Sequence, residues 1–243
     1  MDLNAYEAEA ANEETNWWYV GRRQLFNSVI SGLGIPNKTR VLDIGTSCGG
    51  NLRLLRKCGL TEAFGMDCSS DALRFCISNG FNKVFLGDVT NMPFSEGEFG
   101  LVLATDILEH IDDEGNALAQ IRRIMAPGAH IIITVPSFQS LWGHGDIIAK
   151  HKRRYRLNRL YQLLRDEHLE CSEIFYFNYL LFVPVFFARR IIRATNRRLI
   201  PEANYNAPLL NYFLKFLFAI DVKTARRLKP PFGVSIMAVA KKP

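Results

Sequence analysis

The 243-residue chain lacks the sequence features that mark several classes of protein. Its five cysteines form no Cys-x-x-Cys motif, which argues against a disulfide framework or a zinc knuckle and fits reduced thiols in a cytosol. The acidic N-terminus has no apolar core, so we expect no signal peptide. The apolar runs are too short to span a bilayer, and one of them is interrupted by Pro184. We therefore expect a single cytoplasmic domain over residues 1–243.

Acidic residues are scarce in the C-terminal part of the chain. Residues 150–243 contain 19 Lys and Arg but only 6 Asp and Glu, whereas residues 1–149 contain 11 and 18. The net charge of +6 therefore combines a basic part, at +13, with an acidic part, at −7. A basic part of this kind is typical either of a protein with an anionic partner or of solvated helix faces.

Short apolar segments rich in β-branched residues alternate with helical patterns through the first 136 residues. The segments are 40–45, 63–69, 83–89, 99–106 and 130–136, and two more follow at 171–178 and 234–242. Pro127 and Gly128 are expected to end the helix before the fifth segment. The alternation predicts an α/β fold with a seven-stranded, mostly parallel sheet and helices on both faces. In such sheets, ligands bind beyond the carboxyl ends of the strands.

An acidic residue stands at or near the end of each of the first four predicted strands. These residues are Asp43, Asp67, Asp88 and Asp106. Asp67 follows the glycine-rich turn at 45–50 by about 20 residues, the separation at which a carboxylate can accept hydrogen bonds from ribose hydroxyls. A single acid of this kind is often only a helix N-cap, but four in successive strands indicate a nucleoside site.

The phosphate-binding pattern Gly-x-Gly-x-x-Gly is absent. Residues 45–50 read GTSCGG, so Ser47 stands where a dinucleotide fingerprint has its second glycine. A pyrophosphate needs a close approach of the backbone at that place. No Tyr-x-x-x-Lys pair follows to support a short-chain dehydrogenase. A nucleoside without phosphates is therefore favoured, and an NAD(P)-binding oxidoreductase is the alternative.

Five segments together carry a resemblance to a known family. They are DIGTSCGGN (43–51), GMDCS (65–69), LGDVTNMPF (86–94), LVLATDILEHI (101–111) and PGAHIIITVPS (127–137). In order and spacing they resemble the motifs of class I S-adenosylmethionine-dependent methyltransferases, with Ser47 as a departure from the usual glycine. The segment NWWYVGRR (16–23) and the His-x-Arg-Arg-Tyr element at 151–155 are similar to those of a type 11/12-like subgroup, in which both look like lid elements. The alternatives are a hydrophobic plug for the tryptophans and a solvated helix start for the basic element.

The resemblance implies a Rossmann-like fold, S-adenosyl-L-methionine as the cofactor, and a role for each matching residue. Asp43, Gly45 and Gly49 would frame the methionine and ribose, Asp67 would bind the ribose hydroxyls, Asp88 and the backbone of Val89 would meet the adenine, and Thr105 would face the methionyl group. Cys68, Trp18 and Arg22 complete the predicted cofactor-binding set.

Methyl transfer needs a base only where the acceptor must lose a proton. His110, His144, Asp146 and His151 are candidates, and we select His110 and His151 as the predicted catalytic residues because a histidine suits a hydroxyl acceptor. A structural helix-start histidine is the alternative for His110. We predict no metal site. The predicted acceptor is a small molecule that carries a hydroxyl and could be linked to a lipid or a glycan. The alternative to an enzyme is a non-catalytic scaffold that keeps the fold.

Two segments are predicted to extend this fold. Residues 1–32 form an N-terminal lid, and residues 179–233 are a helical insertion before the last strand. Residues 180–198 and 207–229 both open apolar and turn basic. This pattern predicts peripheral contact with the inner face of a membrane through 180–229, with a homodimer interface or a cap over the acceptor pocket as alternatives. Nucleic acid ranks last, because the element after the fourth strand reads TDILEH and no Pro-Cys nucleophile occurs.

Overall fold

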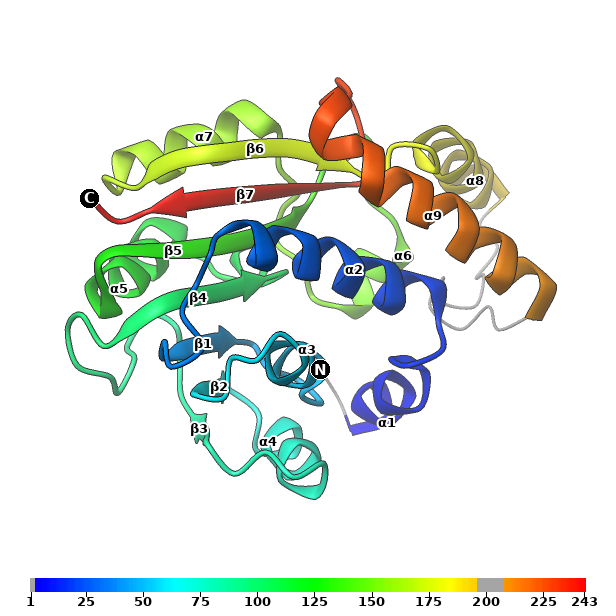
Figure 1. The fold of residues 1–243 in the computed structure, drawn as a ribbon. Helices are drawn as coiled ribbons and strands as arrows, with labels where there is room; N and C mark the ends of the chain where they lie inside the picture. The colour runs from blue at the N-terminus through cyan, green and yellow to red at the C-terminus, as the bar shows by residue number, and fades with distance from the viewer. Residues whose placement is uncertain (1–2, 196–207) are drawn as a thin grey trace.

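A seven-stranded sheet with helices on both faces forms the centre of the computed structural model, which describes residues 3–195 and 208–243 (Figure 1). The strands lie in the order β3-β2-β1-β4-β5-β7-β6, and β7 runs antiparallel to both of its neighbours. The strands are β1 (Val41–Ile44), β2 (Ala63–Asp67), β3 (Val84–Leu86), β4 (Phe99–Thr105), β5 (Met125–Pro136), β6 (Glu170–Phe177) and β7 (Ser235–Lys241). This arrangement confirms the predicted fold class.

The helices cover the sheet in two layers (Figure 1). They are α1 (Leu3–Asn12), α2 (Trp17–Gly32), α3 (Gly50–Lys57), α4 (Ser70–Ser78), α5 (Glu114–Ile124), α6 (His144–Ile148), α7 (Leu157–Asp166), α8 (Phe182–Thr195) and α9 (Pro208–Leu228), with 3-10 turns η1 (Leu108–His110) and η2 (Gln139–Leu141). Helices α5 and α7 bury their leucines and isoleucines against one face. Helices α2 and α3 bury theirs against the other face, where α9 adds Phe218, Val222 and Ala225. The central strands are apolar on both faces for this reason.

The start of β5 differs from the sequence-based expectation. Helix α5 ends at Ile124, and β5 begins at Met125 and runs through Pro127 and Gly128, so the expectation that these two residues end the helix is wrong. Met125 already pairs with Phe99 of β4. The backbone before a proline is biased towards an extended conformation, and here the sheet makes use of that bias.

The insertion before β7 packs against helix α2 through α9. Helices α8 and α9 form its described part, and residues 196–207 of the predicted insertion lie outside the described residues. Asn211 of α9 accepts a hydrogen bond from the backbone N–H of Trp17 at 2.8 Å. Phe218 lies so close to Gly21 that a Cβ there would be 2.1 Å from its ring. Among the described residues, no helix has both the length and the apolar character needed to cross a bilayer.

Candidate active site

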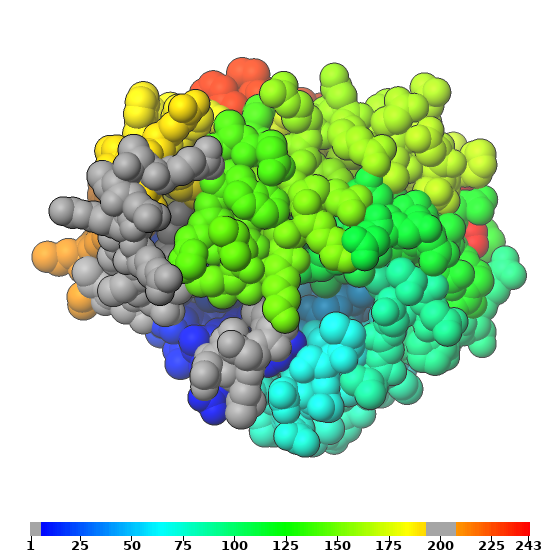
Figure 2. Space-filling model, turned by 180° about the vertical axis from the view of Figure 1, so that it is seen from behind, coloured from blue at the N-terminus to red at the C-terminus, as the bar shows by residue number. Residues whose placement is uncertain are grey.

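A cavity of about 430 Å³ lies at the carboxyl ends of β1, β2 and β4. Seen from the side opposite to Figure 1, the surface is hollowed between the cyan atoms of α4 and the yellow-green atoms of the segment after β5 (Figure 2). Ten of the twelve predicted site residues line the cavity: Trp18, Arg22, Gly45, Asp67, Cys68, Asp88, Val89, Thr105, His110 and His151. The structure therefore brings together side chains that the sequence places on six separate segments.

The glycine-rich turn forms one wall through strained backbone positions. Gly45 has φ +71°, and a Cβ there would lie 2.0 Å from the Ile107 side chain, so only glycine fits without rearrangement. Ser47 also has a left-handed φ of 47°. Its backbone N–H donates to Oδ2 of Asp67 at 3.0 Å. This hydrogen bond ties the turn to the end of β2.

Asp67 is held by two backbone donors. The second is the N–H of Ser69, which donates to Oδ1 at 2.9 Å. The residue is 7% exposed and lines the cavity. An ionised carboxylate offers about four acceptor sites, so two remain for a ligand with vicinal hydroxyls.

Asp43 and Gly49, which the sequence predicts as cofactor-framing residues, lie outside the described lining of the cavity. Asp43 is fully buried and accepts a hydrogen bond from Nδ2 of Asn51 at 2.9 Å. Burial raises the pKa of Asp43 to about 7. Gly49 begins α3 at φ +88°, and its close approach is to the ring of Phe81. Both residues therefore contact the protein interior next to the turn.

Sequence reasoning missed Asn51. Its amide donates to Asp43 and also to Oγ1 of Thr105 at 3.1 Å, which joins β1 to β4 beneath the cavity. The residue closes the segment DIGTSCGGN, and its place in the first turn of α3 is the only signal that the sequence offers.

Asp88 and Val89 occupy the part of the wall after β3. Val89 is buried, whereas Asp88 is exposed. The hydroxyl and the backbone N–H of Thr90 donate to Oδ1 of Asp88 at 2.7 and 2.8 Å. These two hydrogen bonds lower the pKa of Asp88, so its carboxylate is ionised at neutral pH.

The tryptophan-rich segment is both a core element and a cavity wall. Trp18 stacks on Phe218 of α9, with ring centroids 5.5 Å apart. Arg22, one helical turn further along α2, pairs with Asp106 at 2.6 Å and places its guanidinium 5.4 Å from the Trp18 ring. Helix α2 is thereby fixed over the ends of β4 and β5. Trp18 therefore packs in the core, as the plug interpretation expects, and a lid role for it stays a prediction.

Helix α1 adds residues that sequence reasoning missed altogether. Tyr6 and Glu9 line the cavity. Burial raises the pKa of Glu9 to about 7, and a hydrogen bond with the Ser47 side chain opposes the increase. The acidic N-terminus gives no signal for this placement, because an acidic helix face is usually solvated.

The His-x-Arg-Arg-Tyr element precedes α7 and is mostly removed from solvent, with only Lys152 exposed, so the interpretation as a solvated helix start is wrong. Arg154 donates to both carboxylate oxygens of Asp146, at 2.8 and 3.0 Å. Tyr155 is 2% exposed and hydrogen-bonds Glu114. Nδ1 of His151 lies 2.9 Å from Oδ1 of Asp146. Burial alone would raise the pKa of Asp146, but the hydrogen bonds from His151 and Arg154 lower it to about 2.

The two predicted catalytic histidines face each other across one end of the cavity. The ring centroids of His110 and His151 lie 4.8 Å apart in an edge-to-face arrangement. Burial, followed by the charge on His151, lowers the pKa of His110 to about 4. His110 is therefore neutral at neutral pH. His144 is exposed and lies outside the described lining, which removes it as a base candidate.

Comparison with known proteins assigns the family. Residues 19–176 match a family model described as a methyltransferase domain. The chain belongs to the methyltransferase domain family. Among curated proteins, this methyltransferase chain is similar to the probable chloroplastic tocopherol O-methyltransferase of Oryza sativa subsp. japonica. The two are 32% identical over 102 residues, and this alignment covers 38% of the chain and 28% of that protein. It is 29% identical over 100 residues to norajmaline N-methyltransferase of Rauvolfia serpentina, over 38% of the chain and 34% of that protein.

Solved structures confirm the methyltransferase fold. A SAM-dependent methyltransferase from Archaeoglobus fulgidus superimposes with a TM-score of 0.59 at 20% identity, covering 90% of this chain and 94% of that one. The chain spans about a third of the length of the curated relatives that it matches. The similarity therefore establishes the methyltransferase domain.

Proposed function

We propose that this methyltransferase domain binds S-adenosyl-L-methionine in the cavity and transfers its methyl group to a hydroxyl of a small-molecule acceptor. The observation that supports this proposal most strongly is the carboxylate of Asp67. Two backbone N–H groups fix it at the wall of the cavity, and its remaining acceptor sites suit the vicinal hydroxyls of a ribose. A nucleoside is therefore the ligand that the wall fits best.

We assign the other parts of the cofactor to the remaining walls of the cavity. In this proposal Asp88 and the buried Val89 receive the adenine, and Cys68, which follows Asp67 in the chain, also lines the cavity. Gly45 and Thr105 lie next to the methionyl portion. Glu9 and Arg22 cover this portion from the helices α1 and α2, and Arg22 is held there by its ion pair with Asp106, which follows β4. A carboxylate such as Glu9 favours the positive sulfonium.

The reaction is an in-line displacement at carbon. The acceptor oxygen would form a bond to the methyl carbon while the carbon–sulfur bond breaks and its electron pair stays on sulfur, and the proton of the oxygen would pass to Nε2 of His151. Much of the acceleration comes from alignment of oxygen, methyl group and sulfur in one site. His110 and His151 contact the acceptor oxygen at the end of the cavity. Asp146 fixes the ring of His151 through Nδ1, so Nε2 is the nitrogen left for the acceptor.

Calorimetric titration tests the choice of cofactor. We expect S-adenosylmethionine to bind the purified chain with a micromolar Kd and one site per chain. NAD and NADP serve as matched ligands, because the alternative from the same fold class is an oxidoreductase. Tight binding of a nicotinamide dinucleotide with none of S-adenosylmethionine would contradict the proposal and favour that alternative.

We propose a second property for the insertion, contact with an anionic membrane surface. Helix α8 exposes Val183, Phe187 and Ile191 at a spacing of four residues. Helix α9 exposes an apolar stripe as well, formed by Leu209, Tyr212, Phe213, Phe216 and Ile220. Lys215, Lys223 and Arg227 are carried by the same helix. Apolar stripes with adjoining basic residues are typical of helices that lie in a lipid interface. An acceptor with a lipid tail would reach the cavity from such a surface.

Vesicle flotation tests this contact. We expect binding to vesicles that contain phosphatidylserine, weaker binding at high salt, and loss of binding in the double variant Phe213→Ser, Phe216→Ser. Ile77→Ser is the matched control, since Ile77 is an exposed apolar residue on α4, away from the insertion. A variant that still floats would contradict the proposal. A dimer interface would contradict it as well. In that case light scattering would show a dimer of the original chain and a monomer of the double variant.

A further inference from the structure

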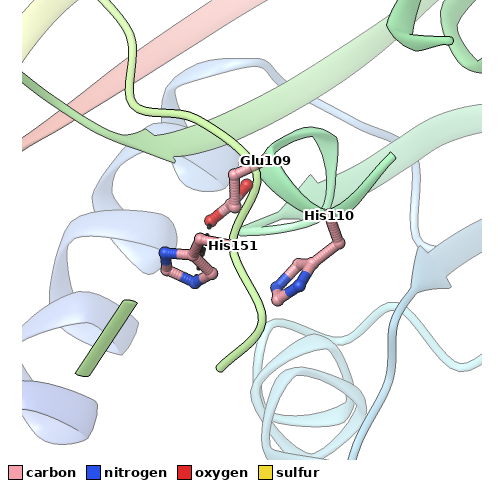
Figure 3. A group of neighbouring side chains, drawn as sticks. All are labelled: Glu109, His110 and His151. Carbon is pink, nitrogen blue, oxygen red and sulfur yellow. Dashed lines mark ion pairs between the residues drawn. The ribbon is translucent and has the colours of Figure 1, made fainter. Parts of the chain in front are cut away.

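The side chains of Glu109, His110 and His151 lie close together (Figure 3), and the two histidines line one end of the cavity. Each side chain offers one ligand atom, and these atoms lie within 4.8 Å of one another. Ligand atoms around a tetrahedral zinc ion, with bonds of about 2.0–2.1 Å, stand about 3.3 Å apart. A small inward movement of the three side chains would bring them to that geometry.

Glu109 is the buried acid of this group. It is fully buried, and neither of its carboxylate oxygens accepts a hydrogen bond from any residue that the structure describes. Nε2 of His151 lies 3.9 Å from its Oε1, which is too long for a hydrogen bond. A buried carboxylate without partners is costly, and binding of a cation is one of the few ways to satisfy it.

The two histidines are held as metal-binding histidines are held. A ligating imidazole usually donates its other ring N–H to a carboxylate or a backbone carbonyl, which fixes its orientation. Nδ1 of His151 meets the carboxylate of Asp146 at 2.9 Å, and Arg154 holds that carboxylate in place. His110 makes a hydrogen bond with the backbone of Lys150. Each histidine therefore keeps one ring nitrogen for a ligand.

We propose that Glu109, His110 and His151 form a binding site for a first-row divalent cation at the acceptor end of the cavity. Two imidazoles and one carboxylate are a donor set of catalytic zinc sites and also of iron(II) sites, both of which keep positions open. Because His110 and His151 line the cavity, an open position would face the acceptor. A cation there would bind the acceptor oxygen in place of the direct contact with the two histidines, and would lower the pKa of the hydroxyl so that its proton passes to water. This role rests on the proposed function, whereas binding of the cation does not.

The sequence predicts no metal site, because the three ligands follow no ligand spacing. Glu109 and His110 are adjacent at the 3-10 turn after β4, and His151 comes from the segment between α6 and α7. Only the tertiary fold brings the two segments together. Within the His-x-Arg-Arg-Tyr element, His151 is then a metal ligand, and Arg154 orients the Asp146 carboxylate that holds His151.

Cobalt(II) titration of the chelator-treated full chain tests the proposal. We expect one cobalt ion per chain with a visible absorption band, displacement by zinc, and at least tenfold weaker binding in Glu109→Gln and in His151→Ala. His144→Ala is the matched control and should bind as the original chain does, since His144 is exposed on α6. Glu109→Gln preserves the size of the buried side chain, and its circular dichroism and thermal unfolding show whether it folds.

The result that would overturn the proposal is equal cobalt binding by Glu109→Gln and the original chain. Absence of stoichiometric binding would overturn it as well, as would a thiolate-to-cobalt absorption band, which would assign the ion to cysteines. S-adenosylmethionine binding is measured on the same samples. A chain that binds the nucleoside but no cation refutes the metal site alone, and a chain that binds the cation but no nucleoside refutes the proposed function alone.

Discussion

Removal of the Asp67 carboxylate is the sharpest test of the cofactor site. In Asp67→Ala, two hydrogen bonds between ribose hydroxyls and a charged acceptor would be lost. Hydrogen bonds to charged groups contribute about 1.5–3 kcal/mol each, so we expect a loss of at least about 1.5 kcal/mol in binding, or more than about tenfold in Kd. Isothermal titration with S-adenosylmethionine measures this change directly.

The same substitution also removes the hydrogen bonds that Asp67 accepts from the backbone of Ser47 and Ser69. A second variant therefore has to separate the loss of the ribose contacts from the loss of these backbone contacts. Asp67→Asn keeps an oxygen that accepts one backbone N–H bond and removes the charge, so its binding loss reports mainly on the ribose. Asp71→Ala is the matched control, because Asp71 is an acid on α4 that lies outside the described lining of the cavity. Binding by Asp67→Ala within about twofold of the original chain would refute the ribose assignment, and so would an equal loss in Asp71→Ala.

Three further predictions concern the frame of the site. Gly45→Ala should lower the free energy of unfolding by at least about 2 kcal/mol, because it combines a left-handed backbone with the clash against Ile107 described above. Gly34→Ala is the control, at φ +63° with no described atom within 4 Å of the added Cβ, and should lower it by only about 1 kcal/mol. Arg154→Ala should cost about 3–5 kcal/mol in chemical denaturation because it leaves the buried Asp146 charge without its main partner, whereas Arg153→Ala, at a partly exposed position, should cost under about 1 kcal/mol. Because the pKa of Asp146 falls from 3.8 to about 2 on folding, its contribution of about 2 kcal/mol should be complete above pH 4 and disappear as the pH falls towards 2. A stability profile that is flat between pH 4 and 2, or that is unchanged in Asp146→Asn, would contradict this last assignment.

The fold and the cofactor wall were accessible from the sequence because their signals are local. Apolar runs predict buried strands, and strand ends converge at one edge of a parallel sheet, so Asp67 and Asp88 could be placed together before any coordinates. The same signal did not separate Asp43 from Asp67. Asp67 is the last residue of its strand, whereas Asp43 precedes Ile44 within a fully buried strand, and this difference of one residue decides which carboxylate lines the cavity.

Contacts between distant segments were not accessible. Glu9 reaches the cavity because α1 packs near α4, and Glu109 meets His151 because two loops converge after β4 and β5. Neither pair has a characteristic spacing. The contact of α9 with α2 through Phe218 and Gly21 also required the tertiary structure, since an exposed amphipathic helix and a packed one have similar sequences.

The central claim is that the acids at the strand ends hold a nucleoside beside the glycine turn. A crystal structure of the chain soaked with S-adenosylhomocysteine tests it most directly. The account predicts ribose hydroxyls within hydrogen-bond distance of the Asp67 carboxylate and the adenine beside Asp88 and Val89. An occupied nucleoside elsewhere on the molecule, or an empty cavity at saturating ligand, would contradict it.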